Sequence, residues 1–226
     1  MQVRTYHDAE EVAAAAADIV TAEIRSGART LVLAGGSTPR RCYQLLAEEE
    51  VEWGRLTILF GDERCVPPDD PQSNYLMARE ALLDRVTPMS VHRMPGELGP
   101  DAAAALYEPV VAALRPLDLV LLGLGPDGHT ASLFPGHQSL QEDKRLVLPV
   151  RGAPKPPPDR VTLGLATLRE ARRILFLVSG RDKADAVSRA RKGQVPASMV
   201  FRADWLIDRA AAGENGSTED GADEDE

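Results

Sequence analysis

The chain has 226 residues, of which 43% are hydrophobic and 27% are charged, a composition typical of a globular protein with one sizeable core or two closely packed lobes. Seven acids and no base lie from Glu214 to Glu226, so the net charge of −9 leaves only −2 for the rest, and no nucleic-acid surface is expected. No apolar run approaches the ~18–20 residues that span a bilayer, and residues 1–7 lack the basic and apolar regions of a signal peptide. We therefore expect a cytoplasmic protein with no nucleic-acid or membrane partner.

Apolar runs and capping residues predict alternating strands and helices in the first half of the chain. Asp8 suits the N-cap of an alanine-rich helix over residues 9–25, which Gly27 ends. Pro39 fits the first turn of another helix, capped by Ser37 or Thr38 and running to about residue 50. The other elements expected here are strands at 3–7, 30–34, 56–60, 90–94 and 117–122, and helices at 73–86 and 101–114.

The second half is less regular. Strands at 146–150 and 161–163 are expected on either side of a stiff loop that contains Lys155 and three consecutive prolines. They are followed by a helix at 165–172, a strand at 174–178, a helix at 183–191 and a last helical piece at 205–212. This alternation predicts one doubly wound α/β domain over residues 1–212, with a mainly parallel sheet flanked by helices. Residues 213–226 are expected to be a disordered acidic tail, with a partner-binding segment as the alternative.

One buried strand is followed directly by residues suited to catalysis. The apolar run 119–122 breaks into a glycine-rich turn that carries Asp127 and His129. Ligands of open α/β sheets bind beyond the carboxyl ends of the strands, which is where these two side chains fall. His129 is therefore a candidate general base and Asp127 a carboxylate that orients it. The alternative is a histidine that is simply hydrogen-bonded within a turn.

A second strand end carries the loop Gly35-Gly36-Ser37-Thr38. Its backbone N–H groups, its hydroxyls and the following helix N-terminus suit a phosphate, although a plain capped turn has the same sequence features. Lys183 follows the strand at 174–178 and would supply a cation at the same sheet edge if the sheet is parallel. A solvated lysine at a helix start is the alternative.

Polar residues also follow the strand at 56–60. Arg64 could bind a carbonyl oxygen or a phosphate, or form only a surface ion pair with Asp62 or Glu63. Asp62 would then contact the substrate or orient Arg64. Asn74 could cap a helix or reach a substrate hydroxyl.

The sequence supports no metal site and requires no cofactor. The four histidines have no HExxH or comparable spacing, and no GxGxxG opens a helix after the first strand. Two cysteines, Cys42 and Cys65, make no disulfide framework, as expected in a reducing compartment. They are interpreted as small apolar fillers, with a pairing between them left open.

Three segments together resemble the 6-phosphogluconolactonase family. They are Ala34-Gly35-Gly36-Ser37-Thr38-Pro39, Gly61-Asp62-Glu63-Arg64-Cys65-Val66-Pro67, and the stretch from Gly123 to Pro135 that contains Asp127-Gly128-His129. Further similarity lies in Ser73-Asn74-Tyr75, in Lys155-Pro156-Pro157-Pro158 with Arg160, and in Gly180-Arg181-Asp182-Lys183-Ala184. The resemblance implies a fold shared with the glucosamine-6-phosphate isomerases. It also implies hydrolysis of 6-phosphoglucono-δ-lactone to 6-phosphogluconate, the second step of the oxidative pentose phosphate pathway.

The resemblance also bears on individual residues. It implies that Lys183 contacts the sugar phosphate. For Asp127, the residues themselves leave two roles open, since it could hold the His129 ring or bind a sugar hydroxyl. The oligomeric state is not determined by the sequence, and a monomer is the expectation.

Two other functions compete with the lactonase. In sugar-phosphate isomerases and deaminases, a glutamate follows the DGH histidine by five positions and the Asp-Glu pair is followed by Tyr. Here these positions are Phe134 and Arg64, which favours the lactonase. A non-catalytic sugar-phosphate sensor would need a DNA-reading segment, and the roughly 28 residues before the first core strand leave no room for one.

Overall fold

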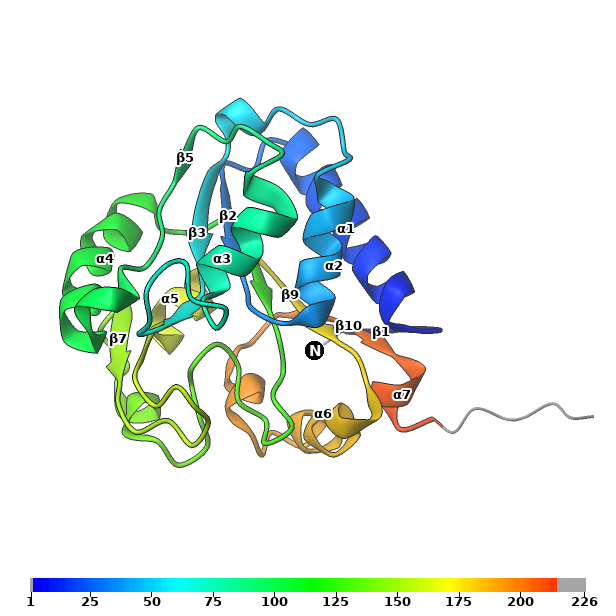
Figure 1. Ribbon diagram of the computed structural model, residues 1–226. Helices are drawn as coiled ribbons and strands as arrows, with labels where there is room; N and C mark the ends of the chain where they lie inside the picture. The colour runs from blue at the N-terminus through cyan, green and yellow to red at the C-terminus, as the bar shows by residue number, and fades with distance from the viewer. Residues whose placement is uncertain (1, 215–226) are drawn as a thin grey trace, which may run out of the picture.

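Seven strands form one sheet in the computed structural model, which describes residues 2–214 (Figure 1). Every neighbouring pair runs parallel, in the order β1-β10-β9-β6-β2-β3-β5. The strands are β1 (Gln2–Tyr6), β10 (Asp204–Asp208), β9 (Arg173–Val178), β6 (Leu119–Leu122), β2 (Thr30–Leu33), β3 (Thr57–Phe60) and β5 (Ser90–Val91). This confirms the expected doubly wound α/β fold.

Helices connect these parallel strands. They are α1 (Ala9–Arg25), α2 (Ser37–Leu46), α3 (Asn74–Ala78), α4 (Pro100–Leu114), α5 (Leu165–Glu170), α6 (Ala184–Arg191) and α7 (Arg209–Ala212). A π-helical turn at Arg79–Leu83 continues α3, and 3-10 turns lie at Trp53–Arg55, Gly96–Leu98, Gln138–Gln141, Arg181–Lys183 and Pro196–Met199. Helices α1 and α2 pack side by side, with α1 over β9 and β10 (Figure 1). As predicted, α1 begins after an Asp8 N-cap, whose carboxylate accepts a 3.0 Å hydrogen bond from the Glu11 N–H.

A second, antiparallel sheet contains β4 (Asp62–Arg64), β8 (Arg160–Leu163) and β7 (Val147–Val150), in the order β4-β8-β7. Only Gly61 separates β4 from β3, so the chain passes from one sheet into the other at the carboxyl end of β3. Helix α4 packs against β7 and β8. The second sheet thus forms one side of the region beyond the ends of the parallel strands.

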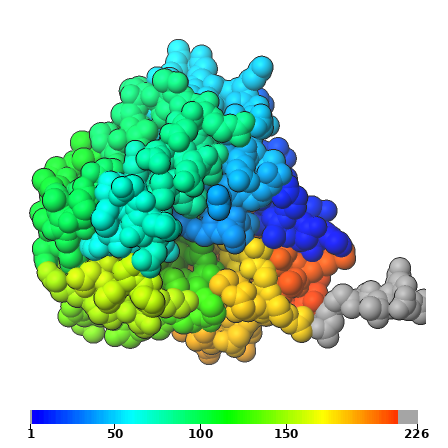
Figure 2. Space-filling model, in the orientation of Figure 1, coloured from blue at the N-terminus to red at the C-terminus, as the bar shows by residue number. Residues whose placement is uncertain are grey.

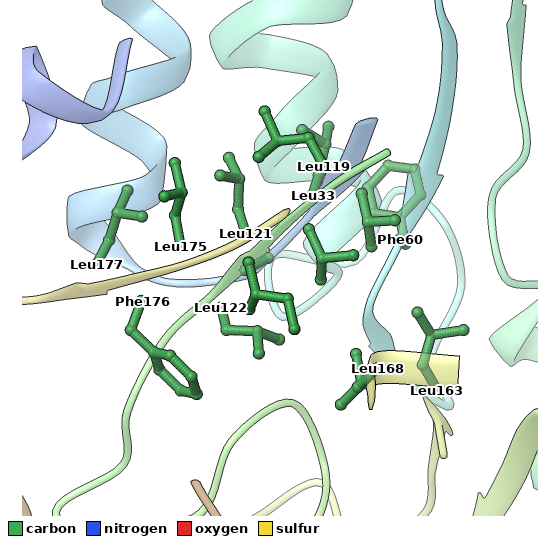
Figure 3. Packing of buried hydrophobic residues seen from close by; sticks show 14 of the residues in the cluster. Leu33, Phe60, Leu119, Leu121, Leu122, Leu163, Leu168, Leu175, Phe176 and Leu177 are labelled. Carbon is green, nitrogen blue, oxygen red and sulfur yellow. The ribbon is translucent and has the colours of Figure 1, made fainter. Parts of the chain in front are cut away.

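The core lies on both faces of the parallel sheet. All residues of β2, β3 and β6 are buried, as expected of parallel strands covered on both sides. In Figure 3, Leu175 and Leu177 project to one side of β9 and Phe176 to the other. The apolar side chains of the two sheets belong to one continuous cluster, apart from Phe134, Val150 and Ala153. Burial on both faces leaves the strand ends as the place for polar side chains.

Three predicted features differ from the structure. A helix is expected over residues 205–212, but only Arg209–Ala212 is helical, as α7, and the part before it lies in β10. There Trp205 lies between β1 and β9 and stacks on Phe176 with ring centroids 4.1 Å apart. This apolar run is too short for its periodicity to separate a buried strand from a helix. In addition, the N-cap of α2 is Gly36 rather than Ser37 or Thr38, with φ at +118° and no side-chain cap. The helix also ends at Leu46, before the predicted end near residue 50.

Three further expectations concern the two cysteines, membrane-spanning helices and the acidic tail. Cys42 and Cys65 are both free thiols, so the pairing left open is not formed, and burial raises the pKa of the Cys65 thiol to about 11. Between residues 2 and 214, no helix is both long and apolar enough to cross a membrane. The predicted acidic tail lies almost wholly outside the described residues, so its disorder and the domain boundary at residue 212 stay predictions.

Tyr43 anchors the end of β2. It is fully buried, and its hydroxyl accepts a hydrogen bond from the Ala34 N–H (2.7 Å) and donates one to the Ala34 carbonyl (2.8 Å). Ala34 directly precedes Gly35, so this side chain on α2 holds the start of the glycine loop.

We expect Tyr43→Phe to lower the free energy of unfolding by about 1–3 kcal/mol, because both polar groups of Ala34 lose this buried partner. Denaturant unfolding measures the change. The control Tyr6→Phe, on the edge strand β1, should shift it by less than about 0.5 kcal/mol. Equal effects of the two substitutions would contradict the anchoring role.

Candidate active site

A cleft of about 300 Å³ opens where β2, β3, β6 and β9 end. The surface is hollowed there between the yellow-green and gold segments in Figure 2. Seven of the ten predicted site residues line the cleft: Gly35, Gly36, Asp62, Arg64, Asn74, His129 and Lys183. A larger hollow of about 780 Å³ lies by Trp53, among segments that precede the strands, and none of the predicted site residues lines it. The predicted site residues therefore converge at the edge of the sheet where the parallel strands have their carboxyl ends.

Asp127 holds the His129 ring. Its Oδ1 lies 2.5 Å from His129 Nδ1 and also accepts a 3.3 Å hydrogen bond from the His129 backbone N–H. Asp127 is not among the residues that line the cleft, and its contact with the ring supports the orienting role of the two left open. With Nδ1 engaged, Nε2 is the ring nitrogen left for a ligand.

The glycine-rich turn makes this pairing possible. A Cβ on Gly125 would lie 2.0 Å from His129 Nδ1 and 2.6 Å from Asp127 Oδ1. Gly128 has a φ of +91°, and a Cβ there would lie 2.4 Å from the Val195 side chain. The Gly125 N–H also donates to the His129 carbonyl at 2.8 Å, closing the turn. Side chains at these glycines would displace the ring or the loop.

The surroundings of His129 favour its neutral form. Burial lowers the pKa of His129 below its ordinary value, and the nearby charge of Lys155 acts in the same direction, while Asp127 opposes both. The ring also contacts Phe134, with centroids 4.5 Å apart, and Phe134 is fully buried. An imidazole held neutral by burial can accept a proton near neutral pH.

Asp62 lies at the start of β4 and is 94% buried, with 6% of its surface exposed. Ser132 Oγ donates to its Oδ2 at 2.6 Å, and Asn74 Nδ2 donates to its Oδ1 at 3.2 Å and to its carbonyl at 2.9 Å. The Asn74 side chain is thus held by Asp62, and it does not cap the helix. The cap of α3 is Ser73, which accepts from the Leu76 N–H. Asp62 is fixed on two sides before any ligand binds.

Glu63 is a buried carboxylate that the sequence reasoning did not single out. It accepts hydrogen bonds from the N–H groups of Arg64, Asn74 and Tyr75, and from Ser73 Oγ, at 2.7–3.0 Å. Burial raises the pKa of Glu63, against these hydrogen bonds. Through them, Glu63 ties β4 to the start of α3.

Arg64 lies at the end of β4 and lines the cleft. Its Nη1 donates to the Gln72 carbonyl at 2.5 Å, and within residues 2–214 its buried Nε has no hydrogen-bond partner. The ion pair with Asp62 or Glu63 that was the alternative does not occur in this described part of the chain. The guanidinium therefore keeps donors for a ligand.

A smaller hollow of about 150 Å³ adjoins the cleft and contains the glycine loop. Gly35, Gly36, Ser37, Thr38 and Lys183 all line it. Lys183 Nζ lies 2.8 Å from Asp182 Oδ2, and Thr38 Oγ1 lies 2.5 Å from Ser179 Oγ. The prediction that Lys183 and the glycine loop share one sheet edge is confirmed. The start of α2 adds backbone N–H groups, and this combination suits an anion.

Besides Glu63, three residues of the site were missed from the sequence. Lys155, in the loop between β7 and β8, and Arg160, the first residue of β8, both line the cleft. Ser132 donates a hydrogen bond to Asp62. From the sequence, the Lys155–Arg160 stretch was interpreted as a stiff loop and as part of the resemblance, and no site residue was assigned in it. In the part of the chain from residue 2 to 214, no group of three His, Cys, Asp or Glu side chains could hold a metal ion.

Residues 7–207 match the family described as glucosamine-6-phosphate isomerases/6-phosphogluconolactonase. The chain belongs to this family. A Streptomyces coelicolor protein named 6-phosphogluconolactonase is 40% identical over 243 residues, covering 93% of each chain. The structure of 6-phosphogluconolactonase from Trypanosoma brucei is similar with a TM-score of 0.85 and 30% identity, covering 94% of this chain and 97% of that one. A monomeric glucosamine-6-phosphate deaminase is similar with a TM-score of 0.83 and 27% identity, covering 95% and 100%.

We expect Asp127→Asn to lower the pKa of His129 further. The carboxylate charge favours the imidazolium, and a neutral amide removes that effect while the burial of the ring remains. NMR titration of the His129 ring protons measures the shift. Asp143→Asn, which neutralises an exposed carboxylate, is the control and should leave the titration unchanged. A higher pKa in Asp127→Asn would show that the carboxylate does not act on this ring.

Proposed function

We propose that this protein hydrolyses 6-phosphoglucono-δ-lactone to 6-phosphogluconate, with His129 as the general base that activates water. The observation that carries the mechanism is the half-buried His129–Asp127 pair, joined at 2.5 Å beside a cleft whose adjoining hollow is lined by the glycine loop and Lys183. The family and the relatives named 6-phosphogluconolactonase support the substrate. The reaction is the second step of the oxidative pentose phosphate pathway.

The phosphate binds in the smaller hollow. Gly35 and Gly36 allow close approach of backbone N–H groups, Ser37 and Thr38 add hydroxyl donors, and Lys183 supplies a cation. The lactone ring then extends into the main cleft toward His129. Asp62 and Asn74 lie along that path, and Asp62 is the carboxylate placed to accept from a sugar hydroxyl.

The chemistry requires one proton carrier. His129 Nε2 takes a proton from water, the resulting hydroxide attacks the C1 carbonyl carbon, and negative charge forms on the carbonyl oxygen. Arg64 donates hydrogen bonds to that oxygen. The ring C1–O bond then breaks, the imidazolium returns its proton to the leaving ring oxygen, and the carboxylic acid ionises to the product. Asp127 stabilises the imidazolium between these steps.

Deamination of an amino-sugar phosphate is the second candidate, because a glucosamine-6-phosphate deaminase is among the similar structures. The position where such enzymes have a glutamate is Phe134, fully buried against the His129 ring. It offers no carboxylate for ring opening. Incubation with glucosamine 6-phosphate is therefore expected to release no ammonia, and sustained release would overturn the lactonase assignment.

A cytoplasmic location, a monomeric state and the absence of a nucleic-acid partner are part of the same proposal. The free thiols of Cys42 and Cys65 are consistent with a reducing compartment.

His129→Ala is expected to reduce kcat about 10²–10⁴-fold relative to wild type, because no other group then accepts the proton from water. The assay uses freshly generated lactone coupled to its downstream dehydrogenase, with the spontaneous rate subtracted. His7→Ala, which removes an exposed histidine, is the matched control and should leave kcat unchanged. Full activity in His129→Ala would move the base elsewhere, with Asp62 the next candidate.

Gly125→Ala is expected to lower kcat about 100-fold, because the added methyl group cannot coexist with the present positions of His129 and Asp127. Gly54→Ala is the control, since a Cβ there meets nothing within 4 Å, and it should retain wild-type kcat. Thermal melts confirm that both variants fold. Wild-type turnover in Gly125→Ala would mean that catalysis tolerates a displaced ring.

A further inference from the structure

The turn after β9 contributes two residues to the hollow assigned to the phosphate. Ser179 and Lys183 both line it, and Ser179 Oγ lies 2.5 Å from Thr38 Oγ1 of the glycine loop. Gly180 lies between them with a φ of +99°, and its carbonyl accepts a 3.1 Å hydrogen bond from the Lys183 N–H. The position of the Gly180 peptide therefore sets the point from which the Lys183 side chain extends.

Gly180 also packs against the carboxylate that pairs with this lysine. Lys183 Nζ lies 2.8 Å from Asp182 Oδ2, and a Cβ on Gly180 would lie 2.9 Å from Asp182 Oδ1. A displacement of Gly180 would therefore move the backbone of Lys183 and the partner of its ammonium group together.

Asp208 holds Gly180 from the neighbouring strand. It is the last residue of β10, and the residue before it, Ile207, is the direct partner of Val178 at the end of β9. Only 5% of its surface is exposed. The Gly180 N–H donates to both of its carboxylate oxygens, at 3.1 Å to Oδ1 and 3.0 Å to Oδ2. This contact attaches the turn after β9 to the edge of the sheet.

Asp208 is also the N-cap of α7, but that role alone does not call for a buried carboxylate. Its Oδ1 accepts a 2.6 Å hydrogen bond from the Ala211 N–H. Asp8 caps the longer helix α1 in the same way and is exposed. Because a buried carboxylate costs free energy unless hydrogen bonds compensate it, the bond to Gly180 accounts for a buried aspartate at this place.

We propose that Asp208 is a positioning residue for substrate binding, which fixes the Gly180 peptide and thereby places the Lys183 ammonium group in the phosphate hollow. This inference rests on the proposed function. Asp208 is not among the described residues that line the cleft or the hollow, so it acts on the ligand through the turn and not by contact. A charged acceptor binds an N–H more strongly than a neutral one, which suits a turn that must keep its shape when an anion binds.

Asp208→Ser separates positioning from capping. Serine is a good N-cap, so its hydroxyl should keep the bond to Ala211, but its single oxygen lies closer to the backbone and loses the bond to Gly180. The KM for the lactone, and the Kd of the product 6-phosphogluconate by titration calorimetry, should rise about tenfold, while kcat changes less than about twofold because the His129–Asp127 pair stays in place. Wild-type KM and Kd in this variant, or a loss confined to kcat, would overturn the proposal.

Asp8→Ser is the matched control, because it makes the same substitution at another aspartate N-cap. It should change neither KM nor kcat, and an equal rise in KM would assign the effect to capping and overturn the proposal. Thermal melts establish that both variants fold. If Asp208→Ser does not fold, Asp208→Asn takes its place, since it keeps the size of the side chain and removes its charge. KM and Kd should then rise in the same direction, and wild-type values would again overturn the proposal.

The action through Lys183 is tested by combining substitutions. Lys183→Met should itself raise KM and Kd, because it removes the cation of the hollow. In that background Asp208→Ser should raise them by less than about a further twofold, since no ammonium group is left to place. A full further tenfold rise would show that Asp208 does not act through Lys183. An unchanged KM in Lys183→Met would show that this lysine does not bind the phosphate, and either result overturns the proposal.

The two proposals fail differently. If wild type does not accelerate lactone hydrolysis, the proposed function is wrong whatever Asp208 does. If wild type accelerates hydrolysis and Asp208→Ser matches it in KM and in 6-phosphogluconate binding, only the assignment of Asp208 is wrong.

Discussion

The parallel direction of all seven strands is the constraint on which the site depends. Parallel strands require a crossover after each strand, and the crossovers cover both faces of the sheet with apolar surface. Polar side chains are then confined to the edges. The carboxyl edge collects the ends of β2, β3, β6 and β9, which bring Gly35, Asp62, His129 and Lys183 together from positions up to 148 residues apart. The fold thus determines where chemistry can occur before any single residue is considered.

Hydrogen bonds among buried polar groups then fix the positions of the side chains at that edge. Asp62 and Glu63 are adjacent carboxylates, each largely removed from water, and such groups are tolerated only when hydrogen-bonded. Glu63 accepts four hydrogen bonds and joins β4 to α3, while Asn74 and Ser132 hold Asp62. A Cβ on Gly35 would lie 2.1 Å from Asn74 Oδ1, so the glycine loop also packs directly against this network. The glycine loop and the hydrogen-bonded carboxylates are therefore packed against each other, so a displacement of one would displace the other.

The sequence predicted the parts of this site that follow strong local signals. A buried apolar run broken by glycines marks a strand end, and this pattern located His129 and the loop at Gly35 without the fold. The second sheet was missed because Asp62 to Arg64 has no apolar alternation and becomes a strand only by pairing with β8. Arg160 was missed as a site residue for the same reason. Its position depends on that pairing, which links residues about 100 positions apart and leaves no periodic trace in either segment.

Groups with opposing effects on its pKa surround the imidazole of His129, the proposed base. Asp127 alone would raise the pKa of the imidazole and favour the protonated form, which cannot accept a proton from water. Burial against Phe134 and the positive charge of Lys155 act in the opposite direction, and the net shift is downward. The carboxylate can therefore orient the ring and stabilise the transient imidazolium without protonating it in the resting state.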